Sequence, residues 1–187
     1  MSLGVGAGSG PEPSALLRAL AHPVRLQVLS LLTGTPMSAA EVARELGLTH
    51  ANASYHLRQL RDAGLVETAE ERSTRGGQER RYRPTPPEDQ PVKGDRTLLA
   101  AAMTQELRRR TALADPDVPG VTADAELWVD PQVWQDVRDR VSQAMVDLHA
   151  AARAPRTPGT HRVAATVALF GMRSTGDRTA SDEGGHR

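Results

Sequence analysis

Residues 49–67 read THANASYHLRQLRDAGLVE, and this segment carries the clearest structural signal in the sequence. Its first half holds small and polar residues, whereas its second half carries leucines at helical spacing before Gly64. At 3.6 residues per turn, Ala53, Leu57 and Leu60 fall on one face of a helix. The opposite face is polar, and its leading turns offer little to bury. This pattern predicts a helix whose leading face fits closely against something outside its own core.

A short capped helix is predicted directly before this one. Ser38 with Glu41 three residues later is a capping-box pattern, and Gly47 is suited to end the helix. Thr49 then caps the helix that follows. Two helices joined by a glycine-containing turn, the second with a polar leading face, form the helix-turn-helix arrangement.

An arginine-rich β-hairpin is predicted to follow. Leu65–Arg72 and Glu79–Pro84 alternate loosely as strands do, and Gly76-Gly77 supplies the turn between them. Residues 72–83 contain five arginines and one acidic residue. A hairpin placed directly after a helix-turn-helix is a wing, and this one concentrates basic charge as a nucleic-acid footprint does.

The stretch from Leu17 to Pro84 resembles the ArsR/SmtB-type winged-helix repressors. Three motifs carry the resemblance in order: LRALAHPVRLQVLSLL, SAAEVARELGLTHANASYHLRQLRDAGLV and GGQERRYR. The resemblance implies a homodimer that binds a pseudo-palindromic operator and releases it on sensing a signal. Metal-sensing members commonly carry cysteines before the recognition helix, or Asp and His on the C-terminal dimer helix. Here VARELGL and Arg96–Leu113 have neither set, so we expect no metal and no cofactor.

The polar helix face predicts contact with double-stranded DNA, because major-groove readout needs side chains that reach base edges without bulk. Asn52 can pair with adenine, Arg58 with guanine or a phosphate, and Tyr55 can pack on thymine methyl groups. Taken alone, the helix is equally consistent with an ordinary solvated face, and the wing favours DNA. The predicted DNA-binding residues are Thr49, His50, Asn52, Ser54, Tyr55, His56, Arg58, Gln59, Arg75, Arg80, Arg81 and Arg83.

The chain is predicted to be mainly α with a β-hairpin wing, followed by a small α+β C-terminal extension. Helices over 14–21 and 24–33 should precede the capped pair, the second being apolar on nearly every side and therefore central. The predicted parts are a disordered N-terminus 1–12, a winged-helix DNA-binding domain 13–84, a linker 85–94, a C-terminal dimerisation or sensing region 95–172 and a disordered tail 173–187.

Two apolar stripes predict a dimer interface. One lies on the first helix, and the other lies on a helix after the linker, where apolar residues recur at four-residue steps. The predicted interface residues are Leu16, Leu17, Leu20, Leu99, Met103 and Leu107.

The last third of the chain is predicted to add a strand over 125–129, a helix from Pro131 and a strand over 161–172. Its Trp128, Trp134 and Phe170 are expected to form a hydrophobic core, with a pocket for an apolar small-molecule effector as the alternative. We recognise no chemistry in this region.

Composition excludes several classes of protein. The 187 residues contain no cysteine, which rules out disulfides and thiolate metal sites. The six histidines are scattered, and His50 and His56, six apart, do not share a helical face. No nucleophile or phosphate-loop motif is present, so we expect no enzyme. No apolar run reaches membrane-spanning length and no secretory signal opens the chain, so we expect no membrane association and a cytoplasmic location.

The sequence therefore predicts a DNA-binding transcriptional regulator, a repressor in first reading, that acts as a homodimer. Between Ser14 and Pro84 ten arginines stand against seven acidic residues, although the whole chain is neutral. The alternative is a protein-interaction module that keeps a degenerate winged helix for assembly. The five arginines of the wing argue against that alternative, because protein contact does not require them.

Overall fold

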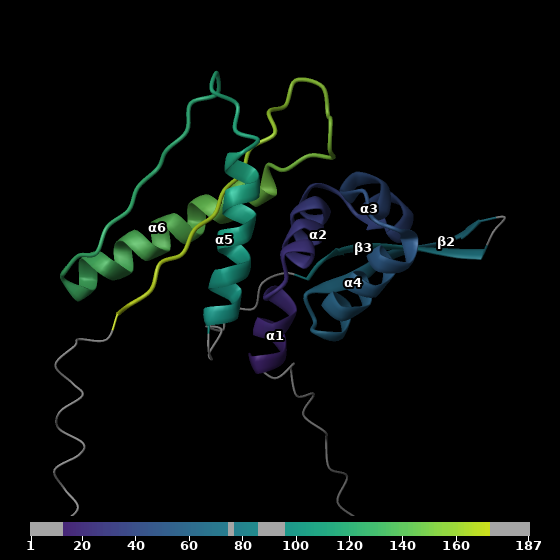
Figure 1. Cartoon of the computed structure of the whole chain (residues 1–187), viewed down its shortest axis with the longest axis horizontal. Helices are drawn as coiled ribbons and strands as arrows, with labels where there is room; N and C mark the ends of the chain where they lie inside the picture. Colours follow the sequence, from purple (N-terminus) through teal and green to yellow (C-terminus); the bar gives the residue numbers. More distant parts are fainter. Residues whose placement is uncertain (1–12, 75–76, 86–95, 173–187) are drawn as a thin grey trace, which may run out of the picture.

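The computed structural model describes residues 13–74, 77–85 and 96–172. In Figure 1, the first four helices and the hairpin form one group, and the later helices lie beside it. The elements are α1 (Pro13–Leu20), α2 (Pro23–Gly34), β1 (Met37–Ser38), α3 (Ala39–Leu46), α4 (His50–Asp62), β2 (Val66–Thr74), β3 (Gly77–Pro84), α5 (Thr97–Thr111) and α6 (Pro131–Ala150).

Helix α2 lies at the centre of the fold, as its all-round apolar sequence predicts. Pro23 occupies its first turn, where a missing N–H costs nothing, and Nδ1 of His22 accepts the Val24 N–H at 3.2 Å. The helix contacts α1, α3, α4, α5 and β3. Its buried Val28 and Leu32 join one hydrophobic core with residues from the two following helices and the sheet.

The sheet has three antiparallel strands in the order β1-β3-β2. The hairpin of β2 and β3 confirms the predicted wing, although the residues of its turn, 75–76, lie outside the described part of the chain. Strand β1 was not predicted, because two residues are too short to show a strand period. It pairs Met37 with Tyr82 and so buries Tyr82 in the core, where the wing is joined to the helices.

Helix α5 packs against α1 and α2 of its own chain. Its inner face includes Glu106, a carboxylate that is only 2% exposed. Gln27 of α2 donates to that carboxylate at 2.6 Å, and Arg109 and Arg110 also pair with it. Burial by itself would raise the pKa of Glu106, but these hydrogen bonds and charges outweigh it and hold the pKa below 4.5.

The predicted α+β extension is wrong in its strands. Helix α6 forms, but residues 125–129 and 161–172 make no strand, and they run as extended chain on either side of α6 in Figure 1. Trp128 is 91% exposed and Phe170 60% exposed, so the aromatic core expected there is also absent. The physical reason is that a strand needs a neighbouring edge, and the described residues of this chain place none beside either segment.

The linker 85–94 and the two predicted disordered ends lie almost entirely outside the described residues. None of the described helices is both long and apolar enough to cross a membrane.

Candidate nucleic-acid interface

Local capping fixes the two helices of the helix-turn-helix. The Glu41 N–H donates to Oγ of Ser38 at 3.4 Å, and the Ser38 N–H donates to Oε2 of Glu41 at 2.8 Å, which completes the predicted capping box. Gly47 ends α3 with a left-handed φ of 65°, a conformation that glycine adopts without strain. Oγ1 of Thr49 then accepts the Asn52 N–H at 3.2 Å and starts α4.

Helix α4 has one buried and one open face. Ala53, Leu57 and Leu60 are fully buried in the core, which anchors the helix rigidly. Burying a leucine side chain stabilises a fold by about 1.5–3 kcal/mol, so this face holds the orientation of the whole helix. The predicted reading residues on the open face are exposed to solvent: Thr49, His50, Asn52, Tyr55, Arg58 and Gln59. Ser54 is partly buried beside them.

His56 lies differently from the other predicted contact residues. Its ring packs on His22 at the junction of α1 and α2, with 4.9 Å between ring centroids. Its Nδ1 is buried and has no hydrogen-bond partner among the described residues. Burial, the facing imidazole and nearby Arg25 all lower the pKa of His56, and burial and Arg25 lower the pKa of His22. The pair is therefore a neutral contact between helices rather than part of the open face.

Two wing arginines stand on the hairpin surface. Arg80 pairs with Glu71 at 2.9 Å, and Arg83 pairs with Glu67 at 2.7 Å, in both cases across the hairpin. Such exposed ion pairs contribute about 0–1 kcal/mol, so a phosphate can compete for the guanidinium. Arg75, another predicted wing contact, lies outside the described residues.

Arg81 is held inside the fold instead. Its guanidinium donates to the Pro36 carbonyl at 2.7 Å and pairs with Glu41 at 3.1 Å. The pairing of Ser38 with Arg81 in the sheet sets this position. Sequence reasoning grouped Arg81 with its neighbours because the short β1, which holds it, leaves no pattern.

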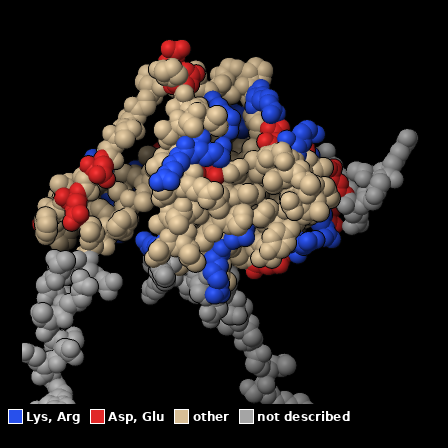
Figure 2. Space-filling model, in the orientation of Figure 1, with Lys and Arg blue, Asp and Glu red and all other residues tan. Residues whose placement is uncertain are grey.

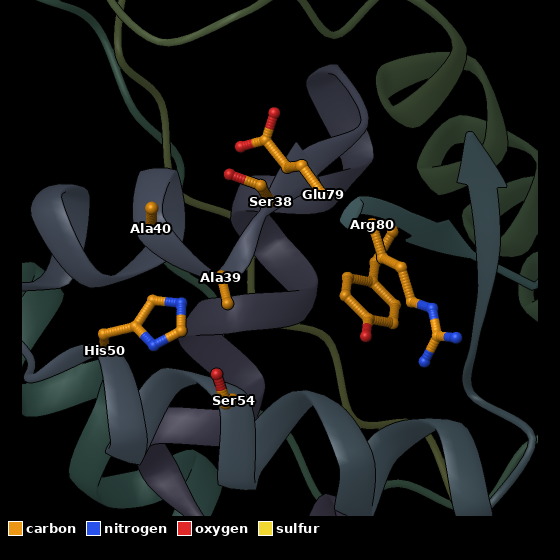
Figure 3. A pocket seen from close by; sticks show the side chains of 8 residues that line it. Ser38, Ala39, Ala40, His50, Ser54, Glu79 and Arg80 are labelled. Atoms are coloured by element: carbon orange, nitrogen blue, oxygen red, sulfur yellow. The ribbon is translucent and has the colours of Figure 1, made fainter. Parts of the chain in front are cut away.

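A hollow lies between the two helices and the wing (Figure 3). Figure 3 shows His50 and Ser54 of α4 facing the start of α3, with Arg80 approaching from β3. Ser38 caps the Glu41 N–H in the first turn of α3, and the N–H groups of Ala39 and Ala40 are left where no helix carbonyl can reach them, which suits an anion. Sequence reasoning missed Ala39 and Ala40 because alanine carries no functional group. The lining residues are Ser38, Ala39, Ala40, His50, Ser54, Glu79, Arg80 and Tyr82.

The helix-turn-helix part of the chain is similar to known proteins. The family model described as helix-turn-helix domain covers residues 20–69. The HTH-type transcriptional regulator YgaV of Escherichia coli is 43% identical over 61 residues, which are 32% of this chain and 62% of that protein. The transcriptional activator HlyU of Vibrio cholerae is 41% identical over 59 residues, covering 32% of this chain and 55% of that protein.

The biofilm growth-associated repressor of Xylella fastidiosa is 37% identical over 57 residues, 30% of this chain and 50% of that protein. The crystal structure of the repressor BigR from Xylella fastidiosa aligns with 51% of this chain and 84% of that chain, at 28% identity and a TM-score of 0.33. The matched region thus spans between half and slightly under two thirds of the length of these three relatives.

Proposed function

We propose that this chain, whose residues 20–69 match a helix-turn-helix domain, binds specific double-stranded DNA and regulates transcription. One observation carries the proposal: the polar face of α4 is open to solvent along its leading turns while its opposite face is fully buried. A rigidly anchored helix with small leading residues can enter the major groove, and the arginine wing lies beside it.

The side chains divide into two roles in this proposal. Asn52, Arg58 and Tyr55 reach base edges in the major groove, with His50 and Gln59 flanking them. Phosphate contacts come from the cap residue Thr49, from Ser54 and from the wing, where Arg80 and Arg83 leave weak ion pairs to make them. The hollow of Figure 3 receives one backbone phosphate between the start of α3 and Arg80. Arg75 adds a further wing contact.

The proposal includes a homodimer on a pseudo-palindromic operator. Two-fold symmetry would place the recognition helices about 34–36 Å apart, one turn of DNA. On α1 and α5 the residues that remain partly accessible for such an interface are Leu16, Leu20, Leu99, Met103 and Leu107. Leu17 is 5% exposed and already packs inside its own chain, so it supports the interface from within.

We infer repression as the mode of regulation, with the bound dimer blocking transcription; the names of the relatives include both a repressor and an activator. We assign the chain no catalytic residue and no metal ligand, and we infer a cytoplasmic location with access to DNA. An apolar small-molecule effector remains a candidate signal, but Trp128 and Phe170 are too exposed in the single chain to form its pocket.

Selection from a library of random duplex DNA tests the proposal directly. The full chain is expected to enrich an inverted repeat whose half-sites lie about 10–10.5 base pairs apart from centre to centre. A transcription assay with the enriched site beside a promoter then decides between repression and activation. If no sequence is enriched while the protein is folded, the winged helix is an assembly module and the proposal is wrong.

A further inference from the structure

The chain after α5 exposes an unusual amount of apolar side chain. Trp128 and Leu127 are 91% and 73% exposed, and α6 buries none of its residues. Soluble proteins rarely leave large contiguous apolar patches uncovered, and such patches mark interaction surfaces. Further large apolar residues are exposed on α6 and the segments flanking it, among them Val121, Val133, Val163, Leu169, Phe170 and Met172.

Two segments flank α6, and each includes an extended stretch whose main chain is unpaired among the described residues. We name residues 121–130 the acidic segment and residues 153–172 the basic segment. Among the described residues, the N–H groups of 121–129 and 161–172 have no main-chain hydrogen-bond partner. Both stretches are rich in the β-branched and aromatic residues that strands prefer. Unpaired extended chain of this composition is a template for pairing with another strand.

The two segments carry opposite charge. The acidic segment holds Asp124, Glu126 and Asp130 with no basic residue, and Figure 2 shows acidic groups along that limb. The basic segment holds three arginines and a histidine with no acidic residue. Within the described part of the chain, Asp124, Glu126 and Arg162 take part in no ion pair of the structure. Each segment therefore repels its own kind and attracts the other.

We propose that the acidic segment of one chain pairs as a β-strand with the basic segment of a second copy, and reciprocally. One chain contains two segments that could form strands and one amphipathic helix. A two-stranded sheet is at best marginally stable alone. Two copies bring four strands and two helices, enough for a sheet with one face covered. The proposal deepens the homodimer of the proposed function and rests on it. DNA would repel the acidic segment. The basic segment of a second copy is the partner whose charge complements it.

The basic segment is already positioned by its own chain. Arg110 of α5 donates to the Ala165 carbonyl at 3.3 Å and lies in contact with Ser30 of α2 at 3.5 Å. Arg156 pairs with Glu45 of α3 at 2.7 Å. These contacts hold the basic segment against the winged helix, so pairing with a partner's acidic segment would join the dimer to the helix-turn-helix of each copy.

Charge reversal in trans tests the proposal by sedimentation equilibrium, without DNA and at low salt. One variant carries Asp124→Arg and Glu126→Arg, and the other carries His161→Glu and Arg162→Glu. Each alone should raise the dimer dissociation constant by about tenfold, because like charges meet at both symmetric contacts. An equimolar mixture should recover the wild-type constant, since both contacts of the mixed dimer are attractive.

Two controls accompany the mixture. Asp117→Arg reverses an exposed charge outside both segments and should leave the constant unchanged. The variant with all four reversals should dimerise as the wild type does, which separates charge effects from misfolding. A mixture that is not rescued would place the pairing within one chain, and unchanged single variants or a monomeric wild type would equally overturn the proposal. DNA is absent from the assay, so its outcome is independent of the DNA selection.

Discussion

Asn52 and Arg81 are both polar residues of the candidate interface, but they differ in what they contact. The Asn52 side chain stands open on α4, whereas the Arg81 guanidinium is tied to Pro36 and Glu41. An exposed side chain is available to contact a base edge, whereas a side chain bonded within the fold stabilises the fold. A substitution of Asn52 should therefore change the affinity for DNA, whereas a substitution of Arg81 should change the free energy of unfolding.

Asn52→Ala should weaken binding to the selected operator by about 1–3 kcal/mol and change binding to random DNA little. The substitution leaves the helix start intact, because Oγ1 of Thr49 accepts the main-chain N–H of residue 52. Fluorescence anisotropy with the two DNAs measures both affinities, and Asp62→Ala at the far end of α4 is the control. Equal losses on both DNAs would show that Asn52 is no base reader.

Arg80→Ala should weaken binding to every DNA alike and reduce the slope of log affinity against log salt by about 0.9 for one lost phosphate contact. Its only described ion pair, with Glu71, is exposed, so the free energy of unfolding should change little. Arg81→Ala should instead lower the free energy of unfolding by about 1–3 kcal/mol, since it removes the charged hydrogen bonds to the Pro36 carbonyl and the partly buried ion pair with Glu41. Urea unfolding and salt titrations separate the two. An Arg81→Ala protein as stable as the wild type would refute the framework role.

At the level of elements, the contact between His22 and His56 joins the α1–α2 junction to α4. Both imidazoles have a pKa below 6.5 in the fold, where burial and Arg25 oppose their charge. The unfolded chain thus takes up protons first as the pH falls. The stability that these residues contribute is complete above their unfolded pKa and is lost as the pH drops below 6.5.

Urea unfolding between pH 7.5 and pH 5 should show this loss, and His56→Gln should make the fall shallower. The window lies above the one in which Glu106 acts. Its lowered pKa gives stability that is lost only as the pH falls below 4.5. An identical pH dependence in the wild type and the His56→Gln variant would show that the histidine contact carries no proton linkage.

Gly34, the last residue of α2, lies against the main chain of Arg153 in the loop that follows α6. A Cβ at this position would overlap the Arg153 carbonyl oxygen, so the main chain of one of the two residues would have to move. Gly34→Ala should therefore displace the loop and break the pair of Arg156 with Glu45, leaving the DNA face unchanged.

Trypsin cleavage after Arg153 and Arg156 should become several-fold faster in the Gly34→Ala variant. Gly120→Ala is the matched control, because a Cβ there meets no atom within 4 Å. Unaltered cleavage in Gly34→Ala would show that the loop does not rest on α2 in solution.

The elements that the sequence predicts well are those with local signals. Ser38, Gly47 and Thr49 bound two helices through caps that act within four residues, and the leucine spacing of α4 identifies its buried face. Strand β1 and the fixed role of Arg81 depend on a partner far along the chain, so no local pattern reveals them. His56 was grouped with the open face because spacing cannot show that His22 lies against it.

On the scale of the whole molecule, the fold divides into a part complete in one chain and a part that is not. The winged helix buries its core around α2, and every predicted element of it is present. The region around α6 has two segments whose sequences favour strands, but neither forms a strand. Its predicted strands failed because pairing requires an edge, which the single chain does not supply. The second copy proposed above would supply that edge.

The ratio of affinities for the selected operator and for a scrambled duplex of equal length tests the central claim most directly. It is measured by anisotropy with the full chain at about 150 mM salt, where screening limits phosphate-only binding. Sequence reading by α4 predicts a ratio of at least about 10³, as specific DNA-binding proteins reach. A ratio near one, with the protein folded and dimeric, would contradict the account.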